Sequence, residues 1–262
     1  MSKISLQMYT MREHTKTFED LKKTVKRLSD IGFETLQYSI PEHFDAKEVK
    51  KLFDEYGIKN DSVFCPSMKI EENMKKIISE CEIFDTKYVR TDSIIPGLTV
   101  SASGYKCFAH YLNEVCEEFK KYGLKMLYHF HAFEFKRFGD EMGIDIILKE
   151  TDPETIQIIP DTHWIHSGGK IIVEFLDKYK DRYDYVHTKD FAIGSRGEKL
   201  EGRPIEFAPV GEGNLDWNPI IEFCKNKGVK SYAIEQDLCY GRDEFDCVKS
   251  SFDFLKKIGV DD

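Results

Sequence analysis

The feature that most constrains this sequence is a regular alternation of two kinds of segment. A short apolar stretch is followed by a longer amphipathic stretch rich in Lys and Glu, and the pair repeats along the chain. Short apolar runs are typical of buried strands, and amphipathic runs are typical of helices with one buried face. The pattern predicts eight strands, at Ile4–Tyr9, Thr35–Ser39, Asp61–Cys65, Tyr88–Asp92, Lys125–Phe130, Ile156–Pro160, Tyr185–Lys189 and Ser231–Gln236.

Eight helices are predicted after these strands. The third to seventh strands start roughly 30 residues apart, which is the length of one βα unit. The predicted helices cover Phe18–Ile31, Ala46–Tyr56, Ile70–Phe84, Tyr105–Tyr122, Ile144–Glu150, Ile171–Tyr179, Pro219–Asn226 and Phe245–Ile258.

Strands that alternate with helices pair in parallel, because each crossover helix carries the chain back to the same end of the sheet. In 262 residues the simplest closed arrangement is an α/β fold, a single (β/α)₈ TIM barrel that occupies residues 1–262 as one domain. An open, doubly wound sheet is the alternative, and it normally has a glycine-rich first βα turn. The first turn here, Tyr9-Thr10-Met11-Arg12, has no glycine, which favours the barrel.

Composition disfavours several classes of protein. The formal net charge is −9, which does not suit a surface that binds a phosphate backbone, so we expect no nucleic-acid partner. We find no apolar run of about 18 residues and no signal-peptide core, so we expect a cytoplasmic protein without a membrane partner. The cysteines are odd in number and form no CxxC pair, which predicts reduced thiols.

Histidines gather at one end of the predicted barrel. Five of the eight lie at or just after three consecutive strands, at His129, His131, His163, His166 and His187. The active sites of such barrels form at the carboxyl ends of the strands. These strand ends are therefore the predicted active site.

The fifth predicted strand places two histidines on one face. Strand residues alternate between faces, so His129 and His131 point one way while Tyr128 and Phe130 point the other. Large aromatic rings suit the side that packs on helices, so the histidines should face the barrel axis. The pattern predicts a metal ligand with a neighbour that contacts substrate; two hydrogen-bonded structural histidines are the alternative.

The next three strand ends each carry a polar side chain toward the same point. Asp161 directly follows the sixth strand, although it could simply cap the next helix. His187 and Lys189 share a face of the seventh strand, and Lys189 could be a solvated cation. Glu235 lies inside an apolar stretch of the eighth strand, where a carboxylate needs a cation or a metal as partner.

Together, four residues on strands five to eight form a candidate metal site: His129, Asp161, His187 and Glu235. Two imidazoles and two carboxylates can hold one divalent ion and leave positions open for substrate oxygens. Such mixed ligands suit Mn²⁺, Co²⁺, Fe²⁺, Ni²⁺ or Zn²⁺ better than Ca²⁺.

A loop after the seventh strand contains the sequence PVGEGNLDW, at residues 209–217. Glycines such as Gly211 and Gly213 permit the close approach of backbone to a ligand. Asn214 or Asp216 is expected to cap the helix that follows.

The chain resembles the sugar phosphate isomerase/epimerase group, the xylose isomerase-like barrels. This group also includes endonuclease IV, inosose dehydratase, hydroxypyruvate isomerase and ketose 3-epimerases. The resemblance covers nearly the whole chain and rests on ordered landmarks: ISLQMYTMRE, IGFETLQYS, YHFHAFEF, DTHWIHSGGK, VHTKDF, PVGEGNLDW and YAIEQD.

The resemblance implies metal ligands on strands five to eight. In the group's epimerases these ligands are Glu, Asp, His and Glu, and the last three match Asp161, His187 and Glu235. The first position is His129 here, and a small shift would nominate His131 or Glu134 instead. The resemblance also implies an Arg after the strand-seven His. It is missing at its usual spacing, and Lys189 or Arg203 is expected to replace it.

We expect an isomerase or epimerase that abstracts a proton next to the carbonyl of a small sugar or keto-sugar, with a metal-bound enediolate. Dehydration of a keto-sugar or inosose is the alternative. An endonuclease or a non-catalytic sugar-binding barrel is less favoured, and a homo-oligomer is possible by family analogy. The expected catalytic residues are Glu235, His131 and Lys189, and the expected substrate-binding residues are Gln37, Trp164, Lys189, Arg203 and Glu134.

Overall fold

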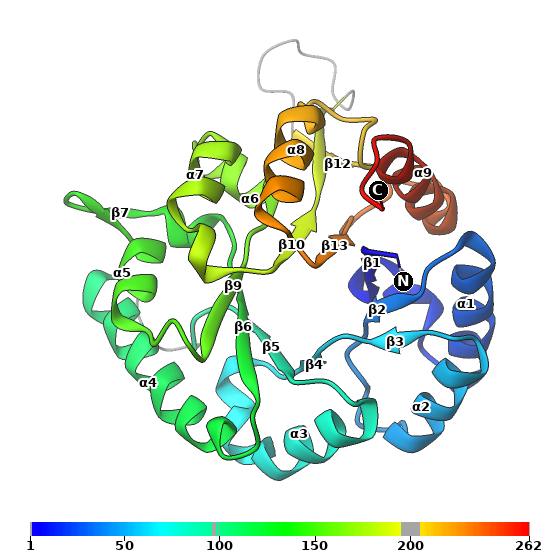
Figure 1. The fold of residues 1–262 in the computed structure, drawn as a ribbon, viewed down its shortest axis with the longest axis horizontal. Coiled ribbons are helices and arrows are strands. Elements are labelled where there is room, and N and C mark those ends of the chain that lie inside the picture. The colour runs from blue at the N-terminus through cyan, green and yellow to red at the C-terminus, as the bar shows by residue number, and fades with distance from the viewer. Residues whose placement is uncertain (1, 96–97, 99, 195–204, 262) are drawn as a thin grey trace.

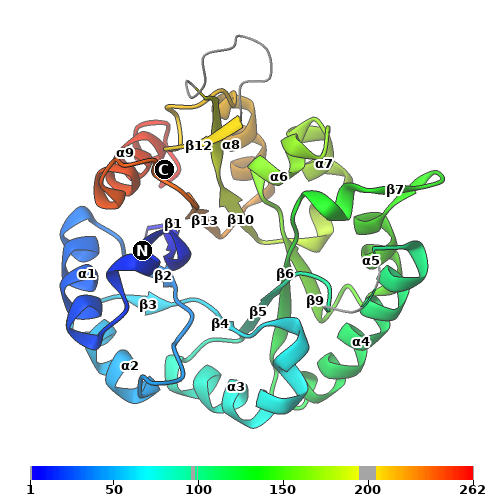
Figure 2. The same ribbon diagram turned by 180° about the vertical axis from the view of Figure 1, so that it is seen from behind.

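A ring of helices surrounds a closed set of parallel strands in the computed structural model, as Figure 1 shows along the barrel axis and Figure 2 from behind. The structure describes residues 2–95, 98, 100–194 and 205–261. The barrel strands are β1 (Ile4–Gln7), β2 (Thr35–Gln37), β3 (Lys59–Asn60), β4 (Val63–Phe64), β5 (Tyr88–Asp92), β6 (Lys125–His129), β9 (Ile156–Ile159), β10 (Tyr185–Thr188) and β13 (Ser231–Ile234).

Nine helices among the described residues cover these strands from outside; eight of them correspond to predicted helices, and α6 was not predicted. They are α1 (Phe18–Ile31), α2 (Ala46–Glu55), α3 (Ile70–Phe84), α4 (Ala102–Lys120), α5 (Gly143–Glu150), α6 (Thr162–Ser167), α7 (Ile172–Lys178), α8 (Trp217–Lys227) and α9 (Glu244–Lys257). Short 3₁₀ helices follow three strands, at Met8–His14, Ser67–Lys69 and Ala132–Phe135, and another follows α7 at Lys180–Arg182.

The barrel consists of two parallel sheets that meet at two junctions. One sheet has the order β10-β13-β1-β2-β3 and the other has the order β4-β5-β6-β9. At one junction β4 lies within the third predicted strand, Asp61–Cys65, and β3 lies just before it. At the other, Asp161 bridges to His187, and the His187 amide donates to the Pro160 carbonyl at 2.8 Å. The predicted (β/α)₈ barrel is thus confirmed.

Strand alternation separates an outer core from the barrel interior. Tyr128 on β6 packs on Phe108 of α4 with ring centroids 5.4 Å apart, and Phe130, directly after β6, packs on Phe175 of α7 at 5.5 Å. Burying an aromatic side chain of this kind contributes about 1.5–3 kcal/mol. Because these rings face the helices, His129 on the same strand faces the barrel axis, as predicted.

A small apolar cluster fills the barrel interior on the strands that carry the predicted site. Its buried members are Leu127, Ile159 and Tyr185, with Tyr88 packed against them. Each of the first three lies two residues before a predicted metal ligand and on the same face of its strand. The cluster therefore forms an apolar floor under the polar residues at the carboxyl ends of the strands.

Local details differ from the prediction where side chains cap helices. Helix α4 starts at Ala102, three residues early, because the Ser101 hydroxyl accepts a hydrogen bond from the Gly104 amide at 3.0 Å.

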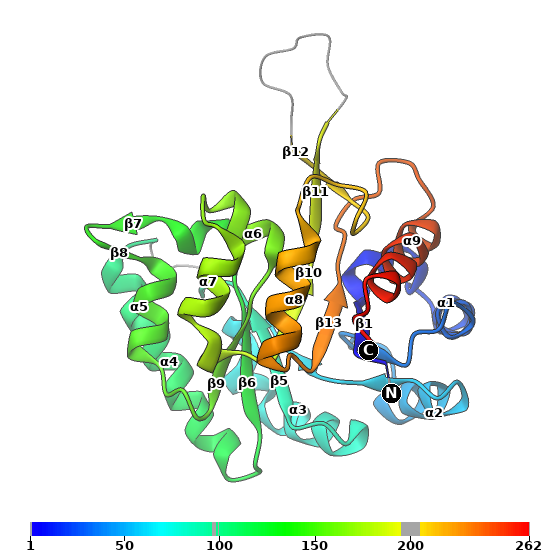
Figure 3. The ribbon, with the colours of Figure 1, turned by 45° about the horizontal axis from the view of Figure 1, so that its top comes forward.

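Two hairpins were not predicted. They are β7 (Arg137–Phe138) with β8 (Glu141–Met142), and β11 (Asp190–Ile193) with β12 (Ile205–Ala208), which rises beside α8 in Figure 3.

Within the part of the chain that the structure describes, no helix combines the length and apolar character needed to cross a bilayer. All seven cysteines are free thiols.

Candidate metal centre

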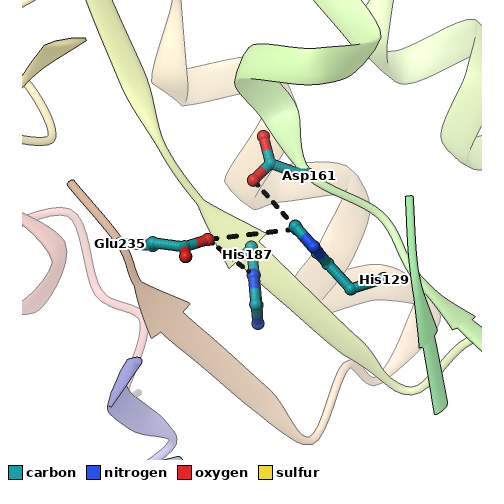
Figure 4. Close-up of side chains that lie close together, drawn as sticks. All are labelled: His129, Asp161, His187 and Glu235. Atoms are coloured by element: carbon teal, nitrogen blue, oxygen red, sulfur yellow. Dashed lines mark hydrogen bonds and ion pairs between the residues drawn. The ribbon is translucent and has the colours of Figure 1, made fainter. Parts of the chain in front are cut away.

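Four side chains from four neighbouring strands converge in the barrel mouth (Figure 4). They are His129, Asp161, His187 and Glu235, and all are buried. One ligand atom from each lies within 4.8 Å of the ligand atoms of the others. The four side chains can therefore hold one metal ion, as mixed nitrogen and oxygen ligands of the kind that transition metals prefer.

The contacts within this cluster are made by the atoms that would bind a metal. His129 Nε2 lies 3.3 Å from Asp161 Oδ2 and 3.9 Å from Glu235 Oε2. His187 Nδ1 lies 3.0 Å from the same Glu235 oxygen. Gln7 donates to the other Glu235 oxygen at 3.2 Å, which fixes the plane of this carboxylate.

Asp161 performs two tasks with its two oxygens. Its Oδ1 accepts a hydrogen bond from the Trp164 amide at 3.0 Å and so caps α6. Its Oδ2 is left to face His129. The helix-cap interpretation and the metal-ligand interpretation are thus compatible, because one carboxylate offers an oxygen to each.

The surroundings of His187 fit a bound cation. Its Nδ1 faces Glu235, and its Nε2 lies 2.8 Å from Gln37 Oε1. Gln37 donates its amide nitrogen to Asp61 at 3.3 Å, which orients its oxygen toward the ring. A neutral imidazole has one N–H and one nitrogen with a free lone pair. Because an oxygen faces each nitrogen of His187, the lone pair must point at one of these two oxygens. A cation at Nδ1 removes this repulsion, and a second hydrogen bond from the far nitrogen is typical of metal-binding histidines.

Burial keeps both histidines neutral, as metal binding requires. Burial lowers the pKa of His129 to about 3, and burial together with the neighbouring His129 lowers the pKa of His187 to about 4. Burial alone would raise the pKa of Glu235, but the ammonium of Lys189 and the hydrogen bond with His187 hold it well below its usual value. The pKa of Asp161 is raised by burial.

Lys189 lies beside the cluster and is almost completely buried. Its Nζ is 3.5 Å from Glu235 Oε2 and 2.8 Å from Asp237 Oδ1. The ammonium also lies over the rings of Trp164 and Phe207, at 5.0 and 5.1 Å from their centroids. It is therefore held in place rather than solvated. Asp237 was not predicted as a site residue. It lies two residues after Glu235, so strand alternation in the sequence could have placed it on the same face.

A cavity of about 660 Å³ opens onto the cluster. Of the predicted residues, His129, His131, Trp164, Lys189 and Glu235 line it. The wall also contains residues that were not predicted, including Gln7, Arg12, Arg90, Asp92 and Asp237.

Two predicted substrate-binding residues lie behind the cavity wall. Gln37 is fully buried between His187 and Asp61, so it orients a ligand of the metal site. Glu134 is also fully buried; its carboxylate accepts hydrogen bonds from the Tyr128 hydroxyl and, at 2.9 Å, from the His131 amide. Neither residue lines the cavity, because each has its polar atoms directed at protein groups. Arg203 lies outside the described residues.

The alternatives for the strand-five ligand occupy different places. His129 contributes to the four-residue cluster, whereas His131 packs edge-on against it and lies near Trp164, 5.4 Å between centroids. The Nδ1 of His131 is buried and has no hydrogen-bond partner in the part of the chain that the structure describes. Burial, together with His129, lowers its pKa to about 3, so it is a neutral ring on the cavity wall.

The backbone amides of the glycine-rich loop at residues 209–217 donate hydrogen bonds to a buried carboxylate of the protein, that of Asp190. Asp190 accepts hydrogen bonds from the amides of Gly211, Gly213 and Leu215 at 3.0, 3.3 and 3.2 Å, and from the Trp217 indole at 2.7 Å. A Cβ on Gly213 would lie 2.3 Å from Asp190 Oδ1. The expectation that these glycines approach a ligand was therefore wrong.

Of the two residues expected to cap α8, Asp216 is confirmed in position only. Asn214 Oδ1 accepts from the Ile193 amide at 3.1 Å, which ties the loop to β11. Asp216 occupies the N-cap position of α8, but its side chain makes no capping hydrogen bond.

A family model named xylose isomerase-like TIM barrel matches residues 25–258. The chain belongs to this family. It is 26% identical over 236 residues to an inosose dehydratase of Geobacillus kaustophilus, which covers 76% of this chain and 74% of that protein. A similar match to an inosose dehydratase of Clostridium perfringens covers 65% of that protein, so the chain spans about two thirds to three quarters of these relatives.

Solved structures share the fold. A sugar phosphate isomerase/epimerase from Parabacteroides distasonis superimposes with a TM-score of 0.78 at 22% identity, over 99% of this chain and 95% of that chain. The IOLI protein, described with a binding zinc atom, has a TM-score of 0.75 at 14% identity, over 98% of this chain and 97% of that chain. At these identities the likeness establishes the TIM barrel fold alone.

Proposed function

We propose that this protein is a divalent-metal-dependent enzyme that removes a proton next to the carbonyl of a small keto-sugar and returns it, as an isomerase or epimerase. The observation that carries the proposal is the convergence of His129, Asp161, His187 and Glu235 beneath a cavity of about 660 Å³. Membership of the xylose isomerase-like family and the zinc atom described for IOLI support it.

The four cluster residues would hold the metal through His129 Nε2, an oxygen of Asp161, His187 Nδ1 and an oxygen of Glu235. When bound, a divalent ion supplies Lewis-acid polarisation of a carbonyl oxygen and of its neighbouring hydroxyl. Gln37 and Gln7 orient His187 and Glu235 by hydrogen bonds, so these ligands are held in one geometry.

Residues on the cavity wall supply the remaining chemistry. A ring nitrogen of His131 accepts the proton from carbon, because this neutral imidazole lines the cavity and no described residue hydrogen-bonds to its Nδ1. Glu235 is the second candidate for this base. The Lys189 ammonium donates to the oxygen on which negative charge develops. Trp164 also lines the cavity, and its indole nitrogen, which has no partner among the residues described, can donate to a substrate hydroxyl.

Dehydration of an inosose or keto-sugar is a second candidate, favoured by the relatives named inosose dehydratase. It begins with the same proton abstraction, after which a hydroxyl on the next carbon leaves as water. The strand-five ligand position holds His129, so the first of the two Glu residues that shuttle protons in the group's epimerases is replaced by an imidazole here. A mechanism in which two Glu residues transfer the protons is therefore disfavoured, whereas an imidazole can still return the proton to carbon.

The proposal is tested by following keto-sugars and an inosose in D₂O by NMR with metal-loaded protein. Deuterium exchange at the carbon next to the carbonyl, lost in His131→Ala or Lys189→Met, would support it. A new epimer or isomer identifies the first candidate, and an enone absorbance identifies the second. Metal-loaded protein that exchanges no proton in any of these compounds contradicts both.

A further inference from the structure

Arg90 is a buried cation that neither the fold nor the proposed chemistry uses. It lies in the middle of β5, only 2% exposed, on the same strand face as Tyr88 and Asp92. The alternation of β5 directs it into the barrel, where it lines the large cavity. Burial of a charged guanidinium is costly unless the charge is paired.

The guanidinium has no hydrogen-bond partner among the described residues. Its Nε and Nη2 are both buried and unsatisfied, and no ion pair joins it to a described carboxylate within 4.0 Å. Its closest defined contact is the face of the Phe64 ring, 4.9 Å from the guanidinium carbon to the ring centroid. The other cations of the cavity differ: Lys189 is paired with Asp237, and Arg12 donates to two backbone carbonyls.

The register places Arg90 next to the metal cluster. Arg90 pairs with Leu127, and Asp92 pairs with His129, so Arg90 lies one interior layer below a cluster residue on the adjacent strand. One layer corresponds to about 6–7 Å along a strand. Arg90, His129 and Glu235 line the same cavity, so a substrate that contacts the cluster can also contact this guanidinium.

We propose that Arg90 binds an anionic oxygen group of the substrate, a carboxylate or a phosphate, at the end remote from the reacting carbonyl. This inference rests on the proposed function and names its substrate class as acidic keto-sugars. The planar guanidinium offers paired N–H groups that match a carboxylate or phosphate in two-point geometry. The carboxylates of Asp61, Glu235 and Asp92 act on this charge from beyond ion-pair distance. A neutral sugar hydroxyl would leave the guanidinium without a direct anionic partner.

The test compares three ketoses that differ only in the group at carbon six. D-Fructuronate has a carboxylate there, D-fructose a hydroxymethyl group and D-fructose 6-phosphate a phosphate. Calorimetric titration of the metal-loaded protein should give about tenfold to hundredfold tighter binding for at least one of the two anions than for fructose, as expected for charge-assisted hydrogen bonds. The tighter of the two anions identifies the group.

Variants separate a direct contact from general attraction of anions. Arg90→Met should remove the preference for the anion over fructose, and Arg90→Lys should restore only part of this preference. Lys16→Met is the matched control, because it removes an equal charge from the cavity wall where Lys16 is exposed and paired with Glu13. The control should keep most of the preference.

Three results would overturn the inference: equal affinities of wild type for the three ketoses, binding of none of them by metal-loaded protein, or equal loss of preference in Arg90→Met and Lys16→Met. If Arg90→Met does not fold, the comparison of the three ligands on wild type still decides. Failure of the proposed function has a different signature, which is absence of bound metal in the protein before any ligand is added.

Discussion

Two aspartates follow neighbouring barrel strands, and both are completely buried, yet their partners differ. Asp190 comes just after β10 and accepts hydrogen bonds from a ring of backbone amides and the Trp217 indole. Asp161 comes just after β9, accepts one amide hydrogen bond, and turns its second oxygen toward His129. The partners therefore distinguish a carboxylate that holds a loop from one that is available to a metal.

The largest expected effect concerns Asp161. Asp161→Asn should lose the bound metal and reduce turnover at least about a thousandfold, because a ligand charge is removed. Stability without metal should stay within about 1 kcal/mol, since Asn is as good a helix cap as Asp. Elemental analysis, turnover and urea unfolding measure the three quantities. Full metal retention in this variant would break the comparison.

Asp190→Ala should have the opposite effect. It leaves buried N–H donors without an acceptor, so the free energy of unfolding should fall by about 3 kcal/mol. The folded fraction should still bind metal with nearly unchanged affinity, because Asp190 makes no contact with the cluster among the hydrogen bonds and ion pairs described. Loss of metal without loss of stability would contradict this assignment.

A smaller effect is expected behind the metal site. Gln37→Leu removes the acceptor for His187 Nε2 and should weaken metal binding about tenfold to a hundredfold. Gln157→Leu is the matched control, because Gln157 Oε1 has no hydrogen-bond partner and its residue lies outside the cluster. Titration against a chelating dye gives both affinities. Equal affinities for the two variants would show that Gln37 does not orient the ligand.

The sequence predicted the barrel because apolar and amphipathic segments alternate along most of the chain. It did not predict that the third strand breaks into β3 and β4, or that α6 starts directly after Asp161. Helix α6 has six residues, which are too few to show a helical periodicity in the sequence. Asp161 starts this helix as its N-cap, and that role was one of two interpretations of the residue.

The site was predictable where one strand determines the direction of a side chain. His129 and Glu235 follow from strict alternation, and the same rule could have nominated Asp237 and Arg90. Gln37 and Glu134 could not be assigned in this way, because their partners lie on other elements. The partner of Gln37 is His187, which is 150 residues away in the chain.

The central claim, that the cluster in the barrel mouth is a metal site, is tested most directly by elemental analysis of purified protein beside Glu235→Gln. The account predicts about one Mn, Co, Fe, Ni or Zn per chain in the wild type and loss of that metal in the variant. No metal in either protein after reconstitution, or equal metal in both, would contradict it.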